Sequence, residues 1–115
     1  MKKFVLFVFN GDPMCFIHVL LNALDMKAKG HDVKLVVEGS ATQLIPELAK
    51  EDHMLFGLWE KVKQQGLVEG VCKACSKKMG TADAAWAQGL ALLEDMNGHP
   101  GMAGYSEQGY EIISF

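Results

Sequence analysis

The chain has 115 residues, half of them hydrophobic, which is enough for one buried core and too few for two ordinary domains, so we expect a single domain over residues 1–115. Its formal net charge is −3 and its eleven basic residues are all lysines, which argues against nucleic-acid binding because arginine usually recognises phosphate and guanine. The apolar runs are too short for a secretory signal or a membrane span, so we expect three reduced cysteines in a cytoplasmic protein with no membrane contact.

The first third of the chain predicts two strands joined by a helix. Residues 4–9 are uniformly apolar, as expected for a parallel strand that is covered on both faces. Asp12 is a suitable N-cap and Pro13 suits the first helical position, so we expect a helix that ends at Gly30. Residues 33–37 then predict the second strand.

The next segment predicts two helices. Ser40, followed three residues later by Gln43, matches a capping box, which is typical of a helix start. Pro46 should kink or interrupt that helix, because proline lacks a backbone N–H group. A second helix is expected to begin near Asp52 and to end at Gly66.

The second half of the chain continues the alternation of strands and helices. We expect a strand at 67–71, a helical turn at 73–79, a helix at 81–89, strands at 90–93 and 110–115, and a short helix opened by Pro100 between these last two. Strands separated by helices of this length indicate a parallel sheet with helices on both faces. The expected fold is a three-layer α/β/α sandwich with a mainly parallel five-stranded sheet.

The carboxyl edge of such a sheet is where ligands usually bind. Several polar or reactive residues should lie there, because they directly follow predicted strands: Asn10, Gly11, Asp12, Glu38, Gly39, Ser40, Cys72, and the segment 95–99 that ends at His99. We therefore expect residues that are far apart in the sequence to meet at this edge.

Cys72 and Cys75 form a C-x-x-C pair where a strand is expected to give way to a helical turn. Backbone N–H groups at a helix start carry partial positive charge, so they should lower the pKa of Cys72 and favour its reactive thiolate. Cys75 should share its face of the helix and could attack a sulfane sulfur or sulfenic acid formed at Cys72. Lys73, Lys77 and Lys78 add positive charge that favours the thiolate, or they are simply a solvated helix surface. Alternatively, both cysteines only fill the core as small apolar residues.

The remaining candidates each have a structural alternative. Cys15 could face Cys72 if the first and third strands are neighbours, or it could pack against the sheet. His99 could donate a proton, bind an anion or shape a turn. A zinc site usually takes four ligands, and the cysteine pair supplies two, so Cys15 and His99 would have to complete it. We expect no metal and no cofactor.

The chain resembles the DsrE/DsrF-like family, which includes the TusD-type sulfur-relay proteins, over nearly all of its length. The resemblance lies in residues 4–8, the Asn10-Gly11-Asp12 segment, residues 33–39, Gly70-Val71-Cys72, and the closing segments 89–93 and 109–113. The sulfur-carrying cysteine of that family ends a strand eight residues before a glycine, and Cys72 and Gly80 have this spacing. The resemblance implies an α/β/α sandwich, homo-oligomers, and a persulfide on Cys72 that is passed to a partner.

The leading hypothesis is therefore a sulfur-transfer or sulfur-trafficking protein, a persulfide carrier that works with donor and acceptor proteins. Whether it also catalyses a reaction stays open. Cys72 would carry the sulfur and Cys75 would assist or resolve, and the substrate side would be formed by Asn10, Gly11, Asp12, Glu38, Gly39, Lys73 and His99. Two alternatives remain: a dithiol redox protein that cycles Cys72 and Cys75 through a disulfide, and a non-enzymatic module for small-anion binding or assembly.

Overall fold

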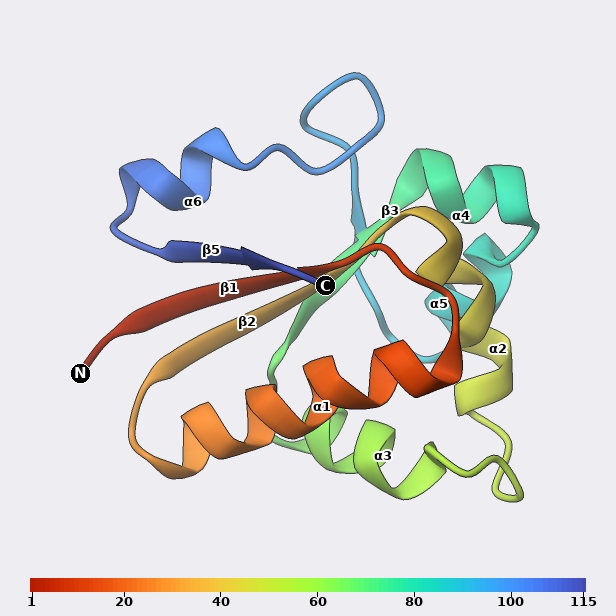
Figure 1. Ribbon diagram of the computed structural model, residues 1–115. Helices are drawn as coiled ribbons and strands as arrows, with labels where there is room; N and C mark the ends of the chain where they lie inside the picture. Colours follow the sequence, from red (N-terminus) through yellow and green to blue (C-terminus); the bar gives the residue numbers. More distant parts are fainter.

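Five strands form one parallel sheet in the order β4-β3-β2-β1-β5 (Figure 1). The computed structural model describes residues 1–115, and its strands are β1 (Lys3–Val8), β2 (Asp32–Val37), β3 (Val68–Cys72), β4 (Leu92–Leu93) and β5 (Glu111–Ser114). All four neighbouring pairs are parallel, so the prediction of a parallel five-stranded sheet is confirmed. The carboxyl ends of the central strands consequently share one edge.

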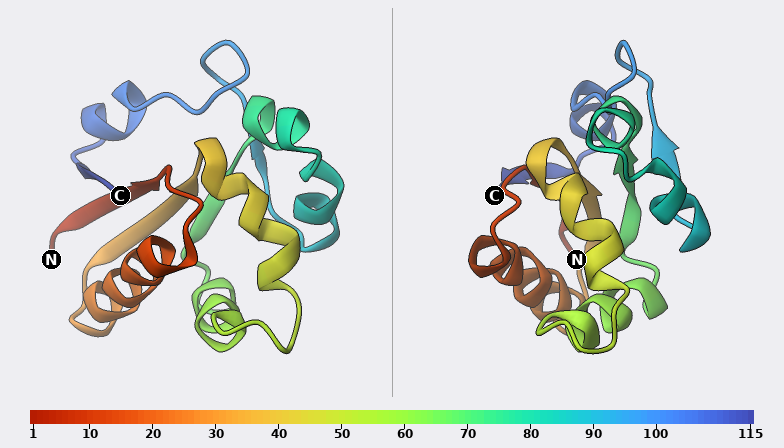
Figure 2. Two further views of the ribbon diagram at one scale, coloured as in Figure 1. Left: turned by 45° about the vertical axis from the view of Figure 1, so that its right-hand side comes forward. Right: turned by 90° about the vertical axis from the view of Figure 1, so that its right-hand side faces the viewer.

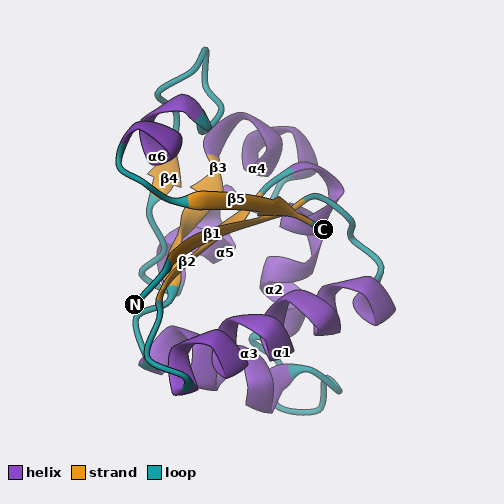
Figure 3. Cartoon of the chain, turned by 60° about the vertical axis from the view of Figure 1, so that its left-hand side comes forward, coloured by secondary structure: helices purple, strands orange, loops and turns teal.

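Helices cover both faces of this sheet. They are α1 (Pro13–Ala28), the 3₁₀ helix η1 (Gly39–Leu44), α2 (Ile45–Leu48), α3 (Phe56–Gln64), α4 (Lys73–Met79), α5 (Ala82–Ala87) and α6 (Ala103–Glu107). α1 and α3 lie side by side below the sheet, whereas α6 lies above it (Figures 1 and 3). The predicted three-layer α/β/α arrangement is therefore present. No helix has both the length and the apolar character needed to cross a membrane.

The two faces of the sheet bury unequal cores, and β1 contributes to both. Leu6 and Val8 belong to a cluster of 20 buried residues shared with α1 and α3. Val5 and Phe7 point the other way, into a cluster of four that packs against α6. A strand that is covered on both faces needs apolar residues at every position, which explains the uniform run in the sequence. Hydrophobic stabilisation scales with buried apolar area, so most of it comes from the α1 and α3 side.

Of the two predictions in the segment after β2, the helix cap was wrong and the interruption was confirmed. Ser40 does not cap a helix, because it lies inside η1, where its hydroxyl donates to the Phe9 carbonyl and accepts from the Gly11 N–H. The interruption expected at Pro46 is present, because η1 ends at Leu44 and α2 begins at Ile45 with the proline in its first turn, where no N–H partner is needed. The chain therefore turns tightly after β2, which keeps η1 at the carboxyl edge of the sheet.

Two later elements are shorter than expected. β4 contains only Leu92 and Leu93, and the last helix begins at Ala103 rather than at Pro100. The residues between them, 94–102, form an irregular loop above the carboxyl edge of the sheet (Figure 1). η1 and α4 lie side by side at the same edge (Figure 2). This edge therefore combines three segments that are distant in the sequence.

Candidate functional site

The site is built around the junction of β3 and α4. Cys72 is the last residue of β3 and the N-cap of α4, and its sulfur accepts a hydrogen bond from the Cys75 N–H at 3.4 Å. α4 ends at Gly80, whose φ of 73° is readily adopted only by glycine. One helical turn separates the two cysteines, so their sulfurs lie on the same side of α4, as the spacing predicts.

His99 is brought to this junction by a tight turn. Met96 and His99 exchange two backbone hydrogen bonds of 2.7 and 2.9 Å. The two residues between them, Asn97 and Gly98, both have positive φ angles of 50° and 89°, which is typical of a type I′ turn. The Gly98 carbonyl accepts a hydrogen bond from the Ala74 N–H at 2.9 Å. The turn is therefore fastened to the first residues of α4.

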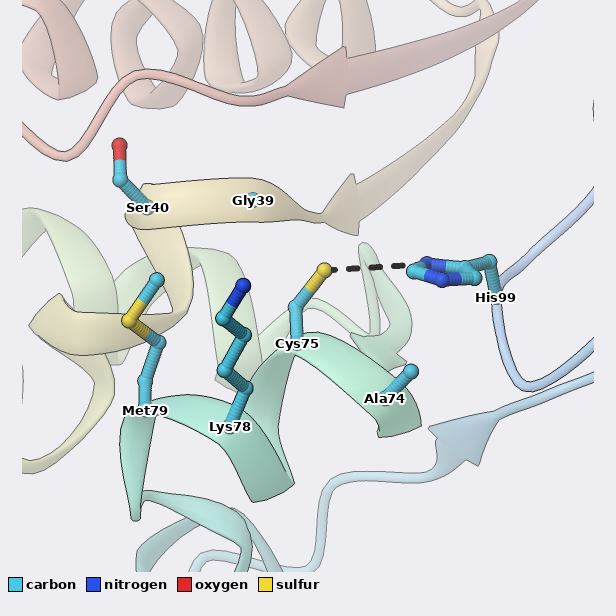
Figure 4. A pocket seen from close by; sticks show the side chains of 7 residues that line it. All are labelled: Gly39, Ser40, Ala74, Cys75, Lys78, Met79 and His99. Atoms are coloured by element: carbon cyan, nitrogen blue, oxygen red, sulfur yellow. Dashed lines mark hydrogen bonds between the residues drawn. The ribbon is translucent and has the colours of Figure 1, made fainter.

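As a result, one imidazole contacts both thiols. The Nδ1 atom of His99 lies 3.1 Å from the Cys72 Sγ and 3.8 Å from the Cys75 Sγ. Figure 4 shows the longer of these two contacts as a dashed line between Cys75 and His99. The three side chains form a compact cluster of two sulfurs and one nitrogen. The cluster joins β3, α4 and the loop after β4.

The two cysteines differ in their access to solvent. Cys75 is half-buried and lines a cavity of about 360 Å³, whereas Cys72 is fully buried behind it. The cavity lies between η1, α4 and the turn that holds His99 (Figure 4), and its lining residues are Gly39, Ser40, Ala74, Cys75, Lys78, Met79 and His99. A small molecule that enters this cavity would therefore meet Cys75 before Cys72.

Burial has the dominant effect on the acidity of this site. Burial is the main cause that raises the pKa of Cys72 to about 12; hydrogen bonding to the Cys75 side chain contributes to this rise, whereas the bond from the Cys75 N–H opposes it. The prediction of a lowered pKa at Cys72 was therefore wrong, because desolvation outweighs the backbone N–H group. Glu38 is also buried, which raises the pKa of its carboxyl group, and the nearby His99 partly offsets this rise.

The segment after β1 lies at the same edge but does not line the cavity. The Asn10 side chain accepts from the Asp12 N–H at 2.8 Å, and the Asp12 carboxylate accepts from the Met14 N–H at 2.9 Å and caps α1. The Gly11 N–H donates to the Ser40 hydroxyl. The polar groups of these three expected substrate residues are thus used to hold the loop and the start of α1.

Of the other expected site residues, some line the cavity and others do not. Gly39 lines the cavity, and Glu38 is buried beside it. Lys73 points to Glu94 and forms an ion pair of 3.0 Å with it. Cys15 is not part of the cluster, because β2 lies between β1 and β3 and the first and third strands are not neighbours. His99 and Gly39 are therefore the expected substrate residues that the structure places in the cavity wall.

The cavity is also lined by Ser40, which the sequence placed at the carboxyl edge, by Lys78, which it placed beside the cysteines, and by Ala74 and Met79, which it did not single out. The spacing of α4 contains a signal for two of them. Lys78 and Met79 follow Cys75 at three and four positions, so they share its side of the helix. Ser40 was expected at this edge, but its contact with the cavity depends on how η1 packs against α4.

Comparisons with known proteins identify relatives but no activity. The chain is 35% identical over 97 residues to the uncharacterized protein MJ0733 of Methanocaldococcus jannaschii, a match that covers 84% of this chain and 77% of that protein. An uncharacterized protein of Archaeoglobus fulgidus is 42% identical over 41 residues, which cover 36% of this chain and 67% of that one.

The fold also has a relative among solved structures. A conserved protein of unknown function, BT1422 of Bacteroides thetaiotaomicron, superimposes with a TM-score of 0.71 over 98% of this chain and 95% of its own, at 17% identity. No family model matches the sequence. The extent and identity of the first match place the chain in the same family as the Methanocaldococcus jannaschii protein.

Proposed function

We propose that this protein is a sulfur-trafficking protein that carries sulfane sulfur as a persulfide on the Cys72 and Cys75 pair. The supporting observation is that two thiols meet beside one imidazole, with one thiol facing a cavity and the other buried behind it. This arrangement offers an entry point and a protected position for the sulfur. It is also consistent with the resemblance to DsrE/DsrF-like sulfur-relay proteins.

The difference in burial assigns different roles to the two cysteines. Cys75 would meet the sulfur donor, because it lines the cavity and Cys72 has no exposed surface. Its thiolate would attack the terminal sulfur of a donor persulfide, forming a persulfide on Cys75 and releasing the donor thiolate. Cys72 would then attack the same terminal sulfur, so that the persulfide moves to Cys72 and the Cys75 thiolate is restored. Each step breaks one sulfur–sulfur bond and forms one.

His99 would act as the general base and acid for the Cys72 thiol in this exchange. Its Nδ1 atom is within hydrogen-bonding reach of the Cys72 thiol at 3.1 Å, and thiolate is the attacking form of cysteine. The imidazole would accept the Cys72 proton as the Cys72 sulfur attacks. It would return the proton to Cys72 when the terminal sulfur is passed to the acceptor. Because the buried thiol holds its proton tightly, Cys72 depends on this partner more than Cys75 does.

A dithiol redox reaction is the second candidate, and the proximity of the two cysteines favours it. If Cys72 attacked the inner sulfur of the Cys75 persulfide, a Cys72–Cys75 disulfide would form and hydrosulfide would leave. The two functions therefore differ in which sulfur is attacked. Reduction of the disulfide by an external thiol would complete that cycle.

The proposed chemistry implies a cell compartment and partner proteins. Three free thiols suit a reducing compartment such as the cytoplasm. A persulfide carrier needs a donor and an acceptor protein, and the family resemblance implies assembly into a homo-oligomer. These partners are part of the proposal.

Mass spectrometry after exposure to a small-molecule persulfide donor tests the proposed function. The wild-type chain and the control variant Cys15→Ser should each gain one sulfur atom, located at position 72 or 75. Cys75→Ser should fail to load, and Cys72→Ser should load at Cys75 alone. Undiminished loading of Cys75→Ser would overturn the entry role of Cys75. A disulfide without any added sulfur would instead support the redox function.

A further inference from the structure

We propose that Cys72, Cys75 and His99 form a zinc-binding site with one coordination position open toward the cavity. Their ligand atoms all lie within 4.8 Å of one another. This inference goes beyond sulfur trafficking, because the metal would occupy the same two sulfurs and only the metal-free protein could be loaded with sulfane sulfur. The expectation of no metal assumed that Cys15 would be required, but the cluster forms without it.

The distances between the three ligand atoms are close to those of a tetrahedral zinc site. With zinc bonded to sulfur at about 2.3 Å and to nitrogen at about 2.1 Å, neighbouring sulfur and nitrogen ligands are about 3.6 Å apart. The Nδ1 atom of His99 lies 3.1 Å from one sulfur and 3.8 Å from the other. The two sulfurs lie within 4.8 Å of each other, against about 3.8 Å in a tetrahedral site. Shifts of about half an ångström in the nitrogen–sulfur distances, and of up to about 1 Å between the sulfurs, would therefore bring all three atoms to bonding distance of a shared ion.

The backbone already holds these ligands in place. Cys72 is fixed by β3 and by its role as the N-cap of α4, and Cys75 lies one turn along that helix. His99 follows a tight turn whose Gly98 carbonyl accepts from the Ala74 N–H at 2.9 Å. No loop has to become ordered when the ion binds, so little conformational entropy would be lost. The site is thus formed by a strand end, a helix start and a hydrogen-bonded turn of the loop after β4.

The ligand types select a soft or borderline metal. Two thiolates and an imidazole suit Zn²⁺, whereas Mg²⁺ and Ca²⁺ prefer oxygen ligands. Two thiolates also neutralise the ion, so Lys78 in the cavity wall would not face a net positive charge. Glu38 supplies a buried carboxyl group that interacts electrostatically with His99 and would help to hold the imidazole.

The cluster contains three ligands, whereas a structural zinc site usually has four from the protein. Cys75 and His99 both line the cavity, so the missing position would point into it. Three protein ligands and one exchangeable water are typical of zinc sites that bind or activate a small molecule. The proposed site is therefore of the open kind, with water in the fourth position.

Zinc titration of the reduced, metal-free chain tests the site. We expect one Zn²⁺ per chain, and zinc should protect Cys75 from a thiol reagent and leave Cys15 reactive. Cys72 is already shielded by its burial, so its protection is not the readout. Cobalt in place of zinc should give a thiolate-to-metal charge-transfer band. Cys75→Ser and His99→Asn should each weaken zinc binding by about 100-fold or more, because a direct ligand is lost, whereas the control Cys15→Ser should not weaken it.

Three outcomes would overturn the zinc site: no saturation at one ion per chain, unchanged affinity in His99→Asn, or equal loss in Cys15→Ser and Cys75→Ser. Circular dichroism of each variant before titration verifies that it is folded. The result is separate from the test of sulfur trafficking, which uses metal-free protein and reads mass rather than metal content. Either proposal can therefore fail while the other holds.

Discussion

Two polar loops leave the carboxyl edge of the same sheet, and only one of them brings a side chain to the thiols. The loop after β1 uses its polar groups on itself: Asn10 and Asp12 bond to nearby N–H groups, and Gly11 bonds to Ser40. The loop after β4 places His99 against Cys72 and Cys75. In the second loop Asp95 also accepts locally, from the Gly101 N–H. The tight turn between Met96 and His99 is nevertheless closed by backbone bonds, so the histidine side chain is left free for other contacts.

This difference shows why a position at the sheet edge is not enough to define a site. Caps and turns satisfy polar groups locally, and a side chain used in this way is no longer available to a ligand. The loop after β1 therefore stabilises the fold, whereas the loop after β4 contributes a side chain to the thiol site. Changes in the first should affect stability, whereas changes in the second should affect thiol reactivity.

The largest expected effect concerns the two thiols that the second loop contacts. In the folded protein at pH 7, a small alkylating reagent should modify Cys75 at least about 100-fold faster than Cys72, because Cys72 is buried and its pKa is raised. The alkylation rate of Cys72 should rise about tenfold per pH unit from pH 7 toward the raised pKa of Cys72, since only the thiolate reacts. Peptide mapping after timed alkylation measures both rates. Equal rates would contradict the assigned roles.

Gly11→Ala should give the largest loss of stability in the first loop. A Cβ atom at this position would lie 2.5 Å from the Ser40 carbonyl oxygen, so the backbone of η1 would have to shift. We expect the free energy of unfolding to fall by about 2 kcal/mol, as is usual for overpacking. Urea denaturation measures it. The control Gly104→Ala, in α6 and with no atom within 4 Å of its Cβ, should not destabilise the protein.

Asp12→Ala should have a smaller effect, because it removes the N-cap of α1 without a steric clash. The expected loss in the free energy of unfolding is about 1 kcal/mol, the typical value for a helix cap. Asp12→Asn keeps a side-chain acceptor and should stay close to the wild type in the same urea titration. If Asp12→Ala slowed the alkylation of Cys75 while leaving stability intact, the loop would have a chemical role after all.

His99→Asn should show the opposite pattern, with the smallest effect on stability. The backbone bonds of its turn remain, so we expect a change of less than about 1 kcal/mol in the free energy of unfolding. The Cys72 thiol would lose its nitrogen contact at 3.1 Å, and alkylation at the cysteine pair should slow several-fold. The rates are measured by peptide mapping of the metal-free protein. A large loss of stability with unchanged rates would make His99 a structural residue.

Local sequence signals predicted much of the fold and part of the site. The uniformly apolar first strand, the Asp12 cap and the glycine that ends α4 were all visible, because each depends on neighbouring residues only. The Asn97-Gly98 dipeptide also contained the signature of a tight turn, and this signal could have located His99 more firmly. Proximity to the thiols was not visible, because it depends on the docking of that turn on α4.

By itself, the sequence determined the alternation of strands and helices, the parallel sheet, and the placement of Cys72 and Cys75 at a strand end, since hydrophobic spacing and capping residues act over a few positions. Only the tertiary structure decided that β2 separates β1 from β3, that His99 joins the cysteine pair, and that Cys72 is buried while Cys75 lines the cavity. Burial and desolvation depend on every segment that packs around a group. They reversed the expected pKa shift of Cys72 for that reason.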